Sequence, residues 1–168
     1  MTDKHRLLRH FLATLAYRTQ KAVRAAPDDF AHFSVGNRVR TPQELVCHMT
    51  SVLGYARARF GGDTFEIATC ATWSEELGRF HSVLADLSDL LEAGAEPVDV
   101  SLEAILQGPF SDAMTHAGQL ALLRRLAGHP VEPENFMRAH IDPDVVGEDQ
   151  PPPASPGRRD GAGADPLQ

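Results

Sequence analysis

Residues 72–94 read TWSEELGRFHSVLADLSDLLEAG, and this stretch decides the fold class of the chain. Thr72 and Glu75 stand three residues apart, as in a capping box at the start of a helix. Gly94 fits the residue that follows a helix. Large apolar residues recur at alternating spacings of three and four, which is typical of the buried stripe of a bundle helix: Leu77, Phe80, Leu84, Leu87 and Leu91.

Two more helices are predicted before this segment. The first spans about 4–25 and stops before Pro27, with an apolar face at spacings of three and four. The second begins at TPQE, where Thr41 can cap, Pro42 suits the first helical position and Glu44 completes a capping box. Both helices have one apolar face, so each needs a neighbour to cover it.

A fourth helix is predicted over about 101–127, and Pro109 is expected to kink it or restart it, because proline removes a helical hydrogen bond. A short fifth helix is expected after Pro133. The sequence lacks alternating runs with hairpin turns, so we find no strand signal. The pattern predicts an all-α fold: a four-helix bundle with one long crossover connection at 25–40.

The chain has 168 residues, which suits one domain. We expect residues 1–147 to form the bundle domain. Residues 148–168 are rich in proline and glycine and have little to bury, so they are predicted to be a disordered tail.

Composition excludes several classes of function. The formal net charge of −7 argues against nucleic acid as a partner, because phosphate binding needs a basic surface. No apolar run is long enough for a membrane span, and the N-terminus lacks the apolar core of a signal peptide. Cys47 and Cys70 form no CxxC pair, so a reducing cytoplasm is the expected compartment.

Three polar residues interrupt the apolar faces and are candidates for chemistry. His48 lies on or beside the stripe of the second helix, and Asp112 and His116 share one face of the fourth helix at i, i+4. A carboxylate and an imidazole at that spacing can share a metal ion. Two structural alternatives stay open at this point: a hydrogen-bonded core histidine at 48, and a hydrogen bond between Asp112 and His116.

Two segments carry a resemblance to a known family: TPQELVCHMTSVLGYARARFGG at 41–62 and DAMTHAGQLALLRRLAG at 112–128. Together they resemble the DinB/YfiT-like superfamily of bacterial four-helix bundles, over about residues 1–140. Members carry a histidine in the second helix, and a His-x-x-x-His followed by Gly-Gln in the last one. His48 and His116 match this pattern, whereas Asp112 stands where the first histidine of the pair is usual.

The resemblance implies a divalent-metal site formed by His48, Asp112 and His116, with zinc, nickel, manganese or iron as the ion. Three protein ligands leave a coordination position open, as in catalytic sites. Gln119 is expected to orient Asp112 or a bound water. The helix after Pro133 leaves open an approach of Glu134 or His140 to the ion.

The resemblance also implies a metal-dependent enzyme, a thiol transferase or a hydrolase-type enzyme that uses a low-molecular-weight thiol such as bacillithiol or mycothiol. A homodimer is expected on the same ground, and a small-molecule substrate. No separate catalytic residue is predicted. The alternative is a non-catalytic dimeric bundle, a binding or stress-response protein without metal.

Overall fold

The computed structural model describes residues 1–61 and 72–153, which form helices and connecting segments without a β-strand. The all-α prediction is therefore confirmed for the described residues, and no helix among them is long and apolar enough to cross a membrane. The α-helices are α1 (Asp3–Val23), α2 (Pro42–Ala58), α3 (Trp73–Glu92), α4 (Leu102–Ile105) and α5 (Ser111–Leu126). Three short turns complete the set: the 3-10 turns η1 (Phe30–His32) and η3 (Phe136–Arg138), and the π-helical turn η2 (Leu106–Phe110).

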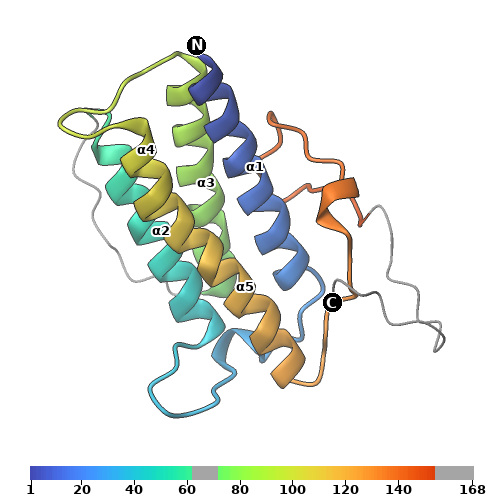
Figure 1. Cartoon of the computed structure of the whole chain (residues 1–168). Helices are drawn as coiled ribbons and strands as arrows, with labels where there is room; N and C mark the ends of the chain where they lie inside the picture. The colour runs from blue at the N-terminus through green and yellow to red at the C-terminus, as the bar shows by residue number, and fades with distance from the viewer. Residues whose placement is uncertain (62–71, 154–168) are drawn as a thin grey trace.

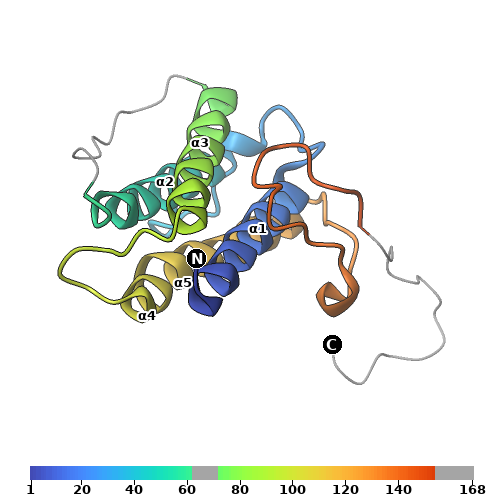
Figure 2. The same ribbon diagram turned by 90° about the horizontal axis from the view of Figure 1, so that it is seen from above.

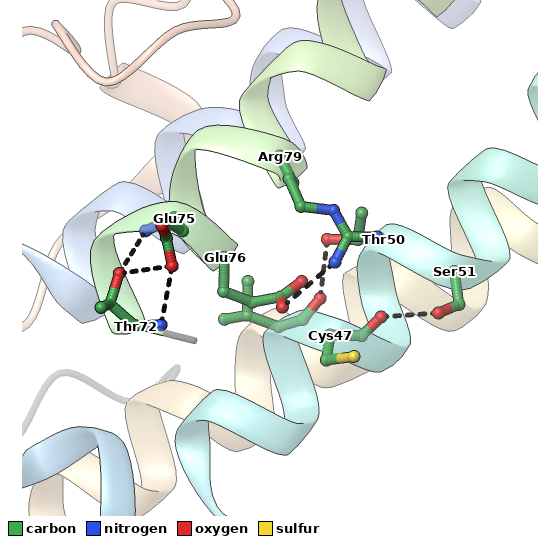
Figure 3. A network of polar contacts seen from close by, with 8 residues as sticks. Cys47, Thr50, Ser51, Thr72, Glu75, Glu76 and Arg79 are labelled. Carbon is green, nitrogen blue, oxygen red and sulfur yellow. Dashed lines mark hydrogen bonds and ion pairs between the residues drawn. The ribbon is translucent and has the colours of Figure 1, made fainter. Parts of the chain in front are cut away.

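Local signals set the helix starts, as the sequence predicts. Thr41 and Glu44 form a capping box at the start of α2, and Thr72 and Glu75 form one at the start of α3 (Figure 3). Each box satisfies two backbone N–H groups that a helix start leaves without partners. Gly94 follows α3 with a φ of +73°, a left-handed conformation that glycine adopts without a Cβ penalty.

The long helices lie side by side around one apolar core (Figure 1). The main packing pairs are α2 with α3, α1 with α5, α1 with α3 and α2 with α5. Burying each large apolar side chain contributes roughly 1.5–3 kcal/mol before entropy is counted. The largest fully buried side chains come from every long helix and from the first connection, and include Phe30, Phe80, Phe110, Leu12, Met49 and Leu120.

The connections fix the helix directions. The Val98 N–H donates to Arg59 O at 2.6 Å, so α2 ends beside the segment that follows α3. At the other end of the molecule, the Trp73 ring that begins α3 meets the Phe30 ring of η1 edge-on. Helices α2 and α3 therefore run in the same direction (Figure 1). The predicted crossover at 25–40 is wrong in its place, because this connection joins the end of α1 to the start of α2 at one end of the molecule (Figure 1).

The segment after α5 runs back along the outer side of α1 (Figure 2). Arg9 donates to an Asp144 carboxylate oxygen at 2.7 Å, and the His81 ring N–H donates to Val146 O at 2.8 Å. The helix predicted after Pro133 is only the single turn η3. Phe136 in that turn packs edge-on against the Tyr17 ring of α1, whereas Met137 is 94 % exposed, so a single apolar contact holds the turn and a longer apolar face that could stabilise a helix is lacking among its residues.

The described part of the predicted tail lies against the helices. Gln150 is 8 % exposed, and Arg24 donates to its carbonyl oxygen. Residues 154–168, the rest of the segment predicted to be disordered, lie outside the described residues.

Candidate metal centre

Helices α2 and α5 bring three predicted ligands together. His48 Nε2 lies 3.2 Å from Asp112 Oδ2, and His116 Nε2 lies 3.6 Å from Asp112 Oδ1. The imidazole rings of His48 and His116 meet edge-on, with centroids 4.8 Å apart. One donor atom from each of the three residues lies within 4.8 Å of the others. This is the group that the sequence singles out. Asp112 and His116 lie on α5, and His48 lies on α2.

The π-helical turn η2 sets the direction of the chain into the site. Pro109 lies inside it and has no N–H to donate, and its ring would clash with the carbonyl four residues earlier in a regular helix. Widening to a π-turn moves that carbonyl away, and the Ser111 hydroxyl donates to Leu106 O at 2.7 Å. The helical conformation thus continues past Pro109 into α5. The extra residue of the turn rotates the positions of Asp112 and His116 about the helix axis.

The two imidazoles have different surroundings. His116 is 7 % exposed, and its Nδ1 lies 2.7 Å from the Gln119 side-chain oxygen, which can only accept. Nδ1 therefore carries the proton, and the lone pair on Nε2 faces Asp112. Sequence reasoning expected Gln119 to orient Asp112 or a water; instead the amide orients His116.

Electrostatics favours the neutral form of His48. Burial lowers the pKa of His48, the charge of Arg40 lowers it further, as does His116 when its ring is protonated, and Asp112 opposes them. Neutral imidazole is the form that binds metal ions. The side chains of His48 and Asp112 are 30 % and 46 % exposed, so the group is open to solvent on one side.

The donor set fits a divalent ion. A tetrahedron with metal–ligand bonds of about 2.0–2.2 Å has edges of about 3.3–3.6 Å, and one donor atom from each of the three residues lies within 4.8 Å of the others, so modest side-chain movements suffice for them to share an ion. Two imidazoles and one carboxylate are a known ligand set for zinc and non-haem iron. The predicted structural alternative, a hydrogen bond between Asp112 and His116, is not formed at 3.6 Å; Asp112 instead accepts from His48 at 3.2 Å.

Cys47 belongs to a different polar cluster, between α2 and α3 (Figure 3). Burial raises the pKa of the Cys47 thiol, and the nearby Glu76 carboxylate raises it further. Glu76 is 1 % exposed, and one of its carboxylate oxygens lies 3.5 Å from Arg79. A thiol held protonated in these surroundings is a poor metal ligand.

Glu134 does not approach the site, and the open possibility that it does is wrong. Its two carboxylate oxygens accept from the Tyr17 hydroxyl and the Lys21 ammonium of α1, each at 2.6 Å. Gly118, in the family-like segment, is exposed, and a Cβ there would meet no atom within 4 Å. Close approach of a helix therefore does not explain that glycine.

A groove adjoins the metal-ligating group, and sequence reasoning did not single out its wall. It has a volume of about 800 Å³ and runs between α2 and the η2–α5 segment. On α2 its lining residues follow His48 at i+3, i+4 and i+7, so they lie on the same helix face as His48, and this spacing could have identified them from the sequence. They are Ser51, Val52 and Tyr55.

Comparison with known proteins finds no matching family model, no matching curated protein and no matching solved structure.

Proposed function

We propose that this protein binds a divalent metal ion through His48, Asp112 and His116 and uses it to act on a low-molecular-weight thiol, as a thiol transferase or a hydrolase-type enzyme. The observation that carries the proposal is the convergence of these three side chains, from α2 and α5, beside an open groove. Zinc, nickel, manganese and iron(II) all accept such a ligand set.

Each residue of the group has a separate role in holding the ion. His48 and His116 offer neutral imidazole nitrogens, and Asp112 offers a carboxylate oxygen and a negative charge. Gln119 holds the His116 ring by accepting from Nδ1. A bound divalent ion supplies the positive charge that keeps a coordinated thiol deprotonated at neutral pH. The groove gives such a ligand access from solvent.

The proposal includes the DinB/YfiT-like four-helix bundle as the fold and a homodimer as the assembly. The packing of α1, α2, α3 and α5 around one core supports the bundle. The dimer rests on the resemblance in the sequence, and light scattering of the purified protein measures it directly.

Metal content of protein purified without a histidine tag tests the site. We expect near-stoichiometric metal in the wild type after incubation with zinc and dialysis, and loss of it in His48→Ala. His10→Ala is the matched control, because His10 is an exposed histidine on α1 away from the group. Wild-type protein that retains no zinc, nickel, manganese or iron would refute the metal function.

Cobalt substitution tests the thiol. In Co(II)-loaded protein, N-acetylcysteine should give a near-ultraviolet sulfur-to-metal charge-transfer band, while N-acetylserine should not. A Co(II) spectrum that N-acetylcysteine leaves unchanged would remove the thiol from the proposal and leave the metal site standing.

The second candidate function is a binding protein without metal. The His48–Asp112 hydrogen bond at 3.2 Å favours it, because the two residues satisfy each other without an ion. In that case His48→Ala lowers the free energy of unfolding, while added zinc leaves the unfolding of the wild type unchanged.

A further inference from the structure

A second pocket lies between α1, α5 and the segment that follows α5. Its volume is about 390 Å³, within the range of small-molecule sites. Its lining shares no residue with the groove beside the metal-ligating group. The pocket is therefore separate from the proposed metal centre, and the metal function makes no use of it.

The floor of this pocket is formed by three small residues of α5, Ala117, Gly118 and Ala121. A glycine inside a helix destabilises the helix relative to alanine, so its presence needs a reason. A Cβ at Gly118 would meet no atom within 4 Å, so close packing does not require the glycine. What the missing side chain provides is open space at the floor of the pocket.

One guanidinium in the pocket wall is dehydrated without gaining an acceptor. The Arg18 guanidinium stacks on the Phe136 ring, 3.9 Å from its centroid. Its Nε is buried without a hydrogen-bond partner, and residues 1–61 and 72–153 form no hydrogen bond or ion pair with it. Burial lowers the pKa of Arg18, and the charge of Glu134 opposes this effect. That carboxylate is already held by Tyr17 and Lys21, so Arg18 has no acceptor of its own there.

The lining of the pocket has an excess of positive charge. Three cations line it, Arg18, Lys21 and Arg125, against two carboxylates, Glu132 and Glu134. The Lys21 and Glu134 charges neutralise each other at 2.6 Å. Three positive and two negative formal charges leave a net charge of +1. One negative charge on a ligand would balance it.

The remaining walls are apolar. Ala22 of α1 and two residues after α5, Val131 and Pro133, offer no hydrogen-bonding side chain. A body without polar groups therefore fits between these walls and the small-residue floor. A planar carboxylate matches the fork of N–H donors on a guanidinium, so it is the anionic group that suits Arg18.

We propose that this pocket binds a small organic carboxylate with a flat apolar body. The carboxylate accepts hydrogen bonds from the Arg18 guanidinium, and Arg125 adds positive charge. The apolar body lies on the floor over Gly118. The inference is independent of the proposed metal function.

Isothermal titration with three probes tests the chemistry of the ligand. Cinnamate has a flat aromatic body and a carboxylate, cinnamyl alcohol has the same body without the charge, and acetate has the carboxylate without the body. We expect cinnamate to bind at least about tenfold more tightly than either, a ratio that corresponds to about 1.4 kcal/mol. Cinnamate that binds no more tightly than both other probes would overturn the inference.

Substitution of the guanidinium tests the anion contact. Arg18→Gln removes the charge and should lower the affinity for cinnamate about tenfold, to that of cinnamyl alcohol. Arg59→Gln is the matched control, because the Arg59 guanidinium also lies over a ring, 4.5 Å from the Tyr55 centroid, outside this pocket. A cinnamate affinity that both variants reduce equally would contradict a carboxylate contact at Arg18.

Filling the floor tests the location without removing any contact of the folded protein. Gly118→Leu places a side chain in the pocket and should lower the affinity for cinnamate at least about tenfold. Gly78→Leu is the matched control, because Gly78 is also an exposed glycine of a long helix whose Cβ would meet no atom within 4 Å. Unchanged cinnamate affinity in Gly118→Leu overturns the inference, whatever Arg18→Gln does.

Dialysis against EDTA separates this pocket from the metal-ligating group, since a metal ion held there would itself attract a carboxylate. We expect the same cinnamate affinity before and after dialysis. Loss of binding after dialysis would place cinnamate at the metal ion and overturn the inference, while leaving the metal function standing.

Discussion

A buried ion pair fastens the C-terminal segment to α1. Lys21 Nζ lies 2.6 Å from Glu134 Oε2, and the Tyr17 hydroxyl donates to Glu134 Oε1 at 2.6 Å. The side chains of Lys21 and Glu134 are 9 % and 0 % exposed. Solvent therefore screens this pair little, and its two charges depend on each other.

We predict that Lys21→Met destabilises the protein strongly. Methionine keeps the length of the side chain but removes the ammonium that pairs with the buried carboxylate, so that of the two charges known to act on Glu134 only that of Arg18 remains. Breaking a buried pair in this way costs about 3–5 kcal/mol, and the retained Tyr17 hydroxyl favours the lower end. The double variant Lys21→Met/Glu134→Leu should recover most of the loss, because an apolar replacement of both partners removes the carboxylate together with its ammonium.

Urea unfolding at neutral pH measures these changes in the free energy of unfolding. They are calculated from the shift of the unfolding midpoint, with the same dependence of free energy on urea concentration for each variant. Lys4→Met is the control, since Lys4 and Glu103 form an ion pair with side chains 65 % and 61 % exposed, and little or no loss is expected there. The reasoning is refuted if Lys21→Met costs no more than Lys4→Met. It is also refuted if the double variant loses the sum of its single substitutions, because coupled charges cannot be additive.

Three other outcomes follow from contacts and pKa shifts elsewhere in the described residues. Burial and the Glu134 hydrogen bond raise the pKa of Tyr17 above its ordinary value of 10.0. The contribution of the protonated Tyr17 to the free energy of unfolding is therefore complete below pH 10.0 and is lost as the pH rises above it. Tyr17→Phe should flatten this alkaline decline in stability, measured by urea unfolding at a series of pH values. Gln119→Ala should weaken zinc binding about 10–100-fold in chelator competition, because it frees the metal-ligating ring, whereas Gln119→Glu, which keeps an acceptor, should not. Thr72→Ala should lower the free energy of unfolding by about 1 kcal/mol through loss of the α3 cap, and Ser74→Ala, on the exposed side of α3, should leave it unchanged.

The helices were predictable because their signals are local. Each capping box lies within four residues, and each apolar stripe repeats along one segment, so no distant contact is needed to recognise them. The π-turn was harder, because Pro109 predicts a disturbance without saying which of kink, restart or widened turn relieves it. Ser111 decides among these, since its hydroxyl takes up Leu106 O.

The C-terminal segment could not be predicted from its own sequence. Its anchors pair residues that are far apart in the chain, as in Arg9 with Asp144 and His81 with Val146. The C-terminal segment supplies the acceptors in these bonds, a carboxylate and a backbone carbonyl, and the donors lie on α1 and α3.

The site was half predictable, because Asp112 and His116 share a helix face by spacing alone, whereas His48 joins them only through the packing of α2 on α5. The carboxylate at 112 then gives the group a property that a third imidazole would lack. It accepts a hydrogen bond from His48, which orients that ring edge-on to His116. It also halves the charge of a bound divalent ion, so the ion retains one positive charge with which to attract a single anionic ligand from the groove.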